Sequence, residues 1–218
     1  MSRPTDLRAV DGRVPGRRGL ATRARLLDQT KDLLATTSYR DLKVVDIARA
    51  AGTSPATFYQ YFPDAEAALL ALADELVGEG RERLTRPVRT ASWSGRGAYD
   101  SCEVIAGTFL DFWDDHRSLL AVIDLAATEG DQRFREIRIR LLNSFTDALR
   151  DVAEDQRSSG RLPADLDPTA TASVLVAMLA QVSGHRYGIE RYGTTTGEIR
   201  RAMARLLYSG VTGRKPPG

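Results

Sequence analysis

The chain has 218 residues, of which 42% are hydrophobic and 28% charged, and its formal net charge is +2. That length is enough for one small domain and one larger domain with its own core. No apolar segment is long enough to span a membrane and no charged-then-apolar leader is present, so we expect a cytoplasmic protein without membrane contact.

The first residues, 1–19, are expected to form a flexible basic arm, because they include two prolines, three glycines and no apolar periodicity. Residues 1–62 carry 11 basic and 6 acidic side chains, a balance of +5, whereas the rest of the chain has a balance of −3. Planar guanidinium groups suit phosphates and the narrow minor groove of DNA. We therefore assign candidate DNA contacts to Arg17, Arg18 and Arg23, with a solvated, nonspecific tail as the alternative.

Two short helices are predicted in residues 44–62, after a longer amphipathic helix that begins near Leu20. The first short helix has one apolar face, because apolar residues recur in it at helical spacing. Gly52 can adopt the left-handed conformation that ends a helix, Ser54 can cap the next one, and Pro55 suits its first position. Such a short turn is typical of a helix-turn-helix, whose second helix lies in the DNA major groove.

The second short helix has the polar surface that a recognition helix needs. Phe58 and Phe62 lie four residues apart and can anchor it, while Gln60 can pair bidentately with adenine. A surface helix with ordinary polar residues is the alternative for an isolated stretch of this length. The candidate DNA contacts are small or hydrogen-bonding residues, namely Thr53, Ser54, Pro55, Ala56, Thr57, Tyr59, Gln60 and Tyr61.

These motifs together resemble the N-terminal domain of TetR-family transcriptional regulators. The segment from Tyr59 to Phe62 matches the family's Tyr-x-x-Phe end of the recognition helix, and the resemblance covers about residues 20–76. One departure is Ala65, since many members have a lysine directly before the acidic residue that opens the fourth helix. A phosphate contact is missing there, and we interpret Asp64 as a helix cap rather than a DNA ligand.

The remainder of the chain is predicted to be helical almost throughout, so the expected fold class is all-α. We divide the chain into an arm (1–19), a three-helix helix-turn-helix domain (20–63), a larger helical effector-binding and dimerisation domain (64–212) and a flexible tail (213–218). Cys102, the only cysteine, is expected to be a buried thiol rather than a redox switch. The predicted helices of the larger domain are 64–84, 98–114, 117–128, 132–156, 168–191 and 196–211.

The resemblance implies a small-molecule pocket among the middle helices. Few charges interrupt their apolar faces, which favours an apolar or amphipathic effector. The alternative is an ordinary packed core, and for His185 a hydrogen-bonded structural role. The candidate ligand contacts are Phe109, Phe112, Trp113, Ile123, Phe134, Ile137, Leu141, Phe145, Met178, Val182 and His185.

The last two predicted helices combine alanines, which permit close approach, with large apolar side chains. By resemblance to the family, these helices form a two-fold homodimer, which would place two recognition helices on the half-sites of a palindromic operator. Core packing within one chain is the alternative. The candidate interface residues are Val174, Leu175, Leu179, Leu206 and Leu207.

The function expected is that of a ligand-responsive repressor that releases double-stranded operator DNA when its effector binds, with activation or corepression left open. A nonspecific DNA-binding protein is one alternative and a helical-bundle enzyme another. The sequence offers the enzyme little, since His116 and His185 are the only histidines and no phosphate loop, nucleophile elbow or metal-spaced pair occurs. The cluster from Asp114 to His116 is expected to be solvated charge at a helix end, and no cofactor or metal is expected.

Overall fold

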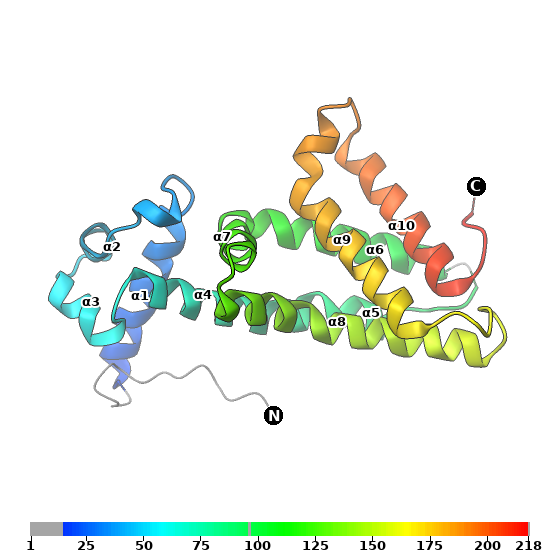
Figure 1. Cartoon of the computed structure of the whole chain (residues 1–218), viewed down its shortest axis with the longest axis horizontal. Helices are drawn as coiled ribbons and strands as arrows, with labels where there is room; N and C mark the ends of the chain where they lie inside the picture. Colours follow the sequence, from blue (N-terminus) through cyan, green and yellow to red (C-terminus); the bar gives the residue numbers. More distant parts are fainter. Residues whose placement is uncertain (1–14, 96, 218) are drawn as a thin grey trace. The chain divides into compact units, whose positions relative to one another are not determined.

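The computed structural model describes residues 15–95 and 97–217, and within them the backbone forms α-helices and one short 3-10 helix but no β-strand (Figure 1). The expected all-α class is confirmed. The chain divides into two compact units: the first contains Met1–Val77 and Ser118–Arg138, and the second contains Gly78–Arg117 and Ile139–Gly218.

The first unit contains the helix-turn-helix, whose helices α1 to α3 follow one another closely in sequence. It also takes the first part of α4, nearly all of α7 and the beginning of α8. The predicted domain boundary at residue 64 therefore does not match the compact units, because residues 118–138 pack with the DNA-binding motif. The bounds are α1 Arg17–Leu33, η1 Tyr39–Asp41, α2 Val44–Ala50, α3 Pro55–Tyr61, α4 Ala65–Arg83, α7 Arg117–Thr128 and α8 Gln132–Ser158.

The second unit is a helical bundle in which α6 packs against both α9 and α10. Its core includes a stacked Phe109–Trp113 pair, and the ring of Phe145 lies edge-on to Phe109 with centroids 4.7 Å apart. Gly210 allows α10 to approach α9 closely, since a Cβ there would lie 3.1 Å from Leu175. The remaining bounds are α5 Thr85–Thr90, α6 Gly97–Asp115, α9 Pro168–Glu190 and α10 Thr196–Thr212.

The turn between α2 and α3 has the expected geometry. Gly52 has φ +65°, and hydrogen bonds from Gly52 N to Arg49 O (3.0 Å) and from Thr53 N to Ala48 O (2.9 Å) close α2 in a Schellman motif. The Ser54 hydroxyl then accepts a 3.1 Å hydrogen bond from Thr57 N, with Pro55 at the first helical position. The local sequence thus determines where the recognition helix begins.

Two predicted boundaries were wrong for identifiable reasons. Helix α1 begins at Arg17 rather than near Leu20, because its first turn is formed by polar residues that give no periodicity. No helix was predicted between residues 84 and 98, yet Pro87 lies at the third position of α5. The first four amide groups of a helix have no intrahelical acceptor, so proline fits there. By contrast, Asp64 caps α4 as expected, accepting a 2.7 Å hydrogen bond from Ala67 N.

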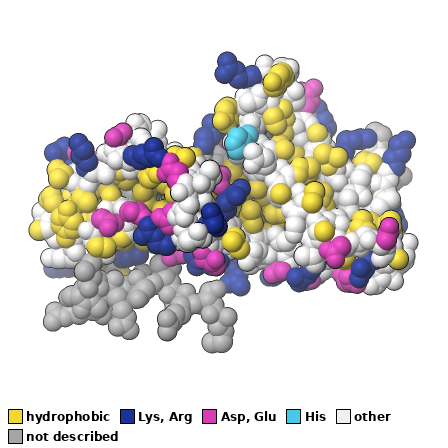
Figure 2. Space-filling model, viewed as in Figure 1, with side chains coloured by type: hydrophobic (Ala, Val, Ile, Leu, Met, Phe, Trp, Pro, Cys, Tyr) yellow, Lys and Arg dark blue, Asp and Glu magenta, His cyan; other side chains and the backbone are white. Residues whose placement is uncertain are grey.

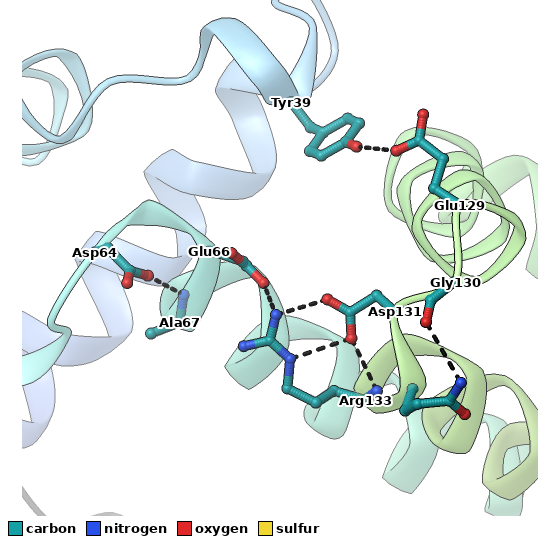
Figure 3. A network of polar contacts seen from close by, with 9 residues as sticks. Tyr39, Asp64, Glu66, Ala67, Glu129, Gly130, Asp131 and Arg133 are labelled. Atoms are coloured by element: carbon teal, nitrogen blue, oxygen red, sulfur yellow. Dashed lines mark hydrogen bonds and ion pairs between the residues drawn. The ribbon is translucent and has the colours of Figure 1, made fainter.

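Residues 129–133, at the turn between α7 and α8, form hydrogen bonds and ion pairs with the segments that precede α2 and follow α3 (Figure 3). On the side that precedes α2, Tyr39 donates a 3.0 Å hydrogen bond to Glu129, which also pairs with Arg40. On the side that follows α3, Arg133 pairs with Glu66 and with Asp131, the latter at 2.6 Å. The Arg133 guanidinium lowers the pKa of Asp131 to about 2, so this carboxylate stays ionised at neutral pH.

Arg23 is buried in the first unit rather than exposed. Its guanidinium lies 5.3 Å from the centre of the Phe62 ring and forms a 3.2 Å ion pair with Glu75 of α4. Its side chain is only 8% exposed. The arginine therefore joins α1 to α4 and covers one of the two aromatic anchors of α3.

We expect Arg23→Ala to lower the free energy of unfolding by about 1–3 kcal/mol, because a charge-assisted hydrogen bond and the packing of the aliphatic stem are both lost. The exposed Arg25, two residues on, is the matched control, and Arg25→Ala should change stability by less than about 0.5 kcal/mol. Urea unfolding followed by circular dichroism measures both. Equal midpoints for the two variants would contradict the structural role of Arg23.

Candidate DNA-binding surface and effector core

The recognition helix α3 buries its two phenylalanines and exposes its polar residues. Phe58 and Phe62 are buried with ring centroids 5.5 Å apart, whereas Tyr59 is 51% exposed. Ser54, Pro55, Ala56 and Gln60 are also exposed, and Thr53, Thr57 and Tyr61 are half-buried. Every candidate DNA contact predicted on this helix is thus open to solvent at least in part.

Three of these hydroxyls already have neighbours within the protein. Ser54 Oγ and Thr57 Oγ1 lie 3.0 Å apart as part of the helix cap. The Tyr61 hydroxyl lies against the first turn of α1, where a Cβ on Gly19 would be 3.2 Å from it. This leaves Tyr59 and Gln60 as the exposed residues of α3 whose polar groups have no hydrogen-bond partner in the described part of the chain and can reach toward bases.

The basic candidates fall into two groups. Arg17 and Arg18 are exposed on the first turn of α1, where they can meet phosphate. The assignment of Arg23 to DNA is wrong, because Glu75 and the Phe62 ring occupy its guanidinium. The rest of the predicted arm, residues 1–14, lies outside the described residues. Lys43, which sequence reasoning missed, is an exposed cation at the start of α2.

The candidate effector contacts are divided between the two compact units. Ile123, Phe134 and Ile137 are buried in the first unit. The others belong to the second unit, where Met178 and Val182 are half-buried. The aromatic core of that unit is continuous from Phe109 to Trp113 and Phe145. Five candidates are buried in the second unit, namely Phe109, Phe112, Trp113, Leu141 and Phe145.

His185 does not face the aromatic core, contrary to its assignment as a ligand contact. It is exposed, its Nδ1 lies 3.2 Å from Gln181 O, and its ring stacks on Tyr187. Two residues earlier, Ser183 is buried on the face of α9 that also carries Leu179. Its spacing of three and four residues from Ala180 and Leu179 was the signal in the sequence that could have found it.

The residues assigned to the dimer interface divide in the same way. Val174 is 69% and Leu206 57% exposed, and apolar side chains lie along α9 on the face seen in Figure 2. Leu175, Leu179 and Leu207 are instead buried in the core of the protomer, so the alternative of packing within one chain holds for these three. Because α9 is apolar on both faces, the spacing of its apolar residues does not show which of them pack in the protomer core and which face a partner.

The acidic cluster at the end of α6 is partly buried rather than fully solvated. His116 Nε2 lies 2.9 Å from Glu79 Oε1, and Arg83 pairs with Asp115 at 2.6 Å and with Glu79 at 3.3 Å. Burial alone would raise the pKa of Glu79. The hydrogen bond with His116 and the pairing with Arg83 outweigh it, so the pKa of Glu79 lies below its ordinary value. These contacts join α4 to α6 within the second unit.

The cysteine, possible metal sites and possible membrane spans were also considered in the sequence, and the structure describes each of them. Cys102 is buried, and burial raises the pKa of its thiol to about 12, as expected for an unreactive cysteine. Across residues 15–95 and 97–217, no group of three or more His, Cys, Asp or Glu side chains could hold a metal ion. In the same residues, every helix is too short or too polar to cross a membrane.

Family models match both parts of the chain. Residues 26–72 match the model of the bacterial regulatory proteins of the tetR family, and residues 84–218 match that of the tetracyclin repressor-like C-terminal domain. The chain is 24% identical over 195 residues to the HTH-type transcriptional regulator EthR of Mycolicibacterium smegmatis, covering 89% of this chain and 88% of that protein. It is also 24% identical over 187 residues to the fatty acid metabolism regulator protein of Bacillus subtilis, covering 85% and 93%.

Solved structures share the fold. The fatty acid degradation regulator FadR from Bacillus halodurans superposes with a TM-score of 0.68 at 17% identity, covering 90% of this chain and 97% of that one. FadR from Bacillus subtilis, solved in complex with stearoyl-CoA, gives 0.67 at 18% identity, covering 86% and 98%. The curated relatives are transcription regulators rather than enzymes, and the C-terminal family model alone matches more than half of the chain. The chain therefore belongs to the TetR family of DNA-binding transcription regulators.

Proposed function

We propose that this protein is a repressor that binds a two-fold symmetric operator as a homodimer and releases it when a small apolar or amphipathic molecule binds. The observation that carries the proposal is α3, a short helix anchored by buried Phe58 and Phe62 with Tyr59 and Gln60 outward. Helices of this kind enter the major groove, and a dimer presents two of them about one helical turn of DNA apart.

The effector class is supported by the aromatic core of the second unit. Phe109, Trp113 and Phe145 form a continuous group of rings in which apolar surface could be buried. The Bacillus subtilis FadR was solved with stearoyl-CoA, a molecule with a long apolar chain, and it has the same fold. An effector that binds one conformation better than the other shifts the population toward the form that no longer fits the operator.

The alternative is a nonspecific DNA-binding protein, which would bind unrelated duplexes with similar affinity. Selection of genomic fragments at physiological salt distinguishes the two. A repressor should enrich one family of two-fold symmetric sites, whereas a nonspecific binder should enrich none, and that result would overturn the proposal.

For the enriched site, we expect Gln60→Ala and Tyr59→Ala each to weaken binding by about 5- to 150-fold, since a specific base contact contributes about 1–3 kcal/mol. Gln132→Ala is the matched control, because Gln132 is an exposed glutamine on α8 of the same unit. Fluorescence anisotropy with labelled operator gives the Kd values. If both α3 variants bound as tightly as the control, α3 would not be the recognition helix.

The two groups of arginine should differ in the salt dependence of operator binding. Arg17→Ala and Arg18→Ala should each reduce the slope of log K against log salt by about one, because each removes one phosphate contact. Arg23→Ala should leave the slope unchanged, because its guanidinium pairs with Glu75. The slopes come from titrations between 50 and 300 mM salt at a temperature where all three variants are folded. A smaller slope for Arg23→Ala alone would reverse our assignment.

Two exposed apolar residues test the dimer. We expect Val174→Glu or Leu206→Glu to yield a folded monomer, because each introduces a charge into an apolar face that the partner would bury. Val104→Glu is the control, since Val104 is 59% exposed on α6. Sedimentation velocity gives the mass of each variant, and circular dichroism checks the fold. Dimers that persist in both α9 and α10 variants would place the interface elsewhere.

A further inference from the structure

The buried face of α9 carries a hydroxyl that has no hydrogen-bond partner in the described part of the chain. Ser183 is 5% exposed, and its Oγ is buried and unpaired. Other helical hydroxyls of this protein donate to the carbonyl four residues earlier, as Thr30 does at 2.7 Å and Thr212 at 2.7 Å. A buried polar group without a partner destabilises the fold, and natural proteins contain few of them.

A second unpaired donor lies one turn further along α9. Arg186 Nε is buried without a hydrogen-bond acceptor, since the carboxylate of Glu190 is 3.6 Å away and beyond hydrogen-bond distance. The terminal nitrogen of the same guanidinium pairs with Asp114 of α6 at 2.6 Å. Residues three apart share one helix face, so Ser183 and Arg186 present two donors toward the same side of α9.

The indole of Trp113 borders this position from α6. Its Nε1 would lie 3.2 Å from a Cβ on Gly184, so α9 passes directly beside it. The indole ring, which stacks on Phe109, therefore adjoins α9 at the residue that follows Ser183.

The charges around these donors favour a neutral acceptor. The positive charge of Arg186 is balanced by Asp114, which also pairs with Arg117 at 3.0 Å. A carboxylate ligand would therefore be repelled by Asp114, and no unpaired cation lies beside it to offset that repulsion. A carbonyl oxygen accepts hydrogen bonds from hydroxyl, guanidinium and indole groups alike and adds no charge.

We propose that the effector carries a neutral carbonyl group, as in a ketone, ester, thioester or amide, whose oxygen accepts hydrogen bonds at Ser183 Oγ and Arg186 Nε. The apolar body of the effector packs against Phe109 and Trp113. This inference rests on the proposed function, because it assigns the chemistry of the effector that the repressor senses. Ser183 and Arg186 then discriminate carbonyl compounds from hydrocarbons of the same shape.

The test uses three probes of similar shape on the 218-residue Trp93→Phe protein, in which Trp113 is the only tryptophan and reports binding by fluorescence. The probes are 4-phenyl-2-butanone, the hydrocarbon isopentylbenzene and the carboxylate 3-phenylpropanoate. We expect the ketone to bind about 3- to 10-fold tighter than either of the others, in line with one or two net hydrogen bonds.

Ser183→Ala should remove most of the preference for the ketone over the hydrocarbon and leave the hydrocarbon Kd unchanged. The same variant should raise the thermal midpoint of the free protein by about 1–4 °C, because an unpaired buried hydroxyl is removed. A hydroxyl with a purely structural role would lower that midpoint instead. Ser101→Ala is the control, since the Ser101 hydroxyl already donates to Gly97 O at 2.9 Å.

A ketone preference that survives in Ser183→Ala overturns the inference, as does tighter binding of the carboxylate or failure of all three probes to bind. Operator selection and the α3 variants are measured without any probe. They judge the proposed repressor independently, so the two conclusions can fail separately.

Discussion

The DNA-binding surface depends on the burial of two phenylalanines beneath a helix of seven residues. A helix this short is not stable alone in water, because the cost of nucleating it exceeds what so few backbone hydrogen bonds return. Phe58 and Phe62 fasten α3 to the first unit, and Arg23 covers Phe62 from α1. Only because one face is fixed in this way can the opposite face carry Tyr59 and Gln60 into solvent with a defined orientation.

The turn between α7 and α8 adds a second set of contacts to the same motif. It bonds to Tyr39 and Arg40 before α2 and to Glu66 after α3, so both flanks of the helix-turn-helix meet one short segment. Exposed ion pairs of this kind contribute little stability, because water and salt screen them. These contacts instead hold residues 118–138 in the first unit with the DNA-binding motif, although these residues fall within the C-terminal family match.

Helix positions were predictable because caps and apolar periods are local. Asp64, Ser54 and Gly52 act as their sequence context indicated, and α7 has the predicted bounds. Arg23 and His185 could not be assigned in the same way. Whether a cation faces DNA or a carboxylate depends on Glu75, which lies 52 residues away in the chain. The helical spacing of apolar residues likewise identifies an apolar face, but it does not show whether the same chain or a partner covers that face.

Helix α9 illustrates that limit, because it has two faces with different roles. One face packs against α6 and α10 and includes Leu179, Ser183 and Arg186, whereas the other exposes Val174. An effector bound at Ser183 and Arg186 would contact the helix that also carries the proposed dimer face. Moving a two-state equilibrium from 1:99 to 99:1 requires a difference in binding free energy of about 5.5 kcal/mol. Two hydrogen bonds of about 0.5–1.5 kcal/mol each fall short of that value. Most of the shift must therefore come from apolar surface that the effector buries in one conformation and not in the other, while the polar pair selects which apolar molecules can produce it.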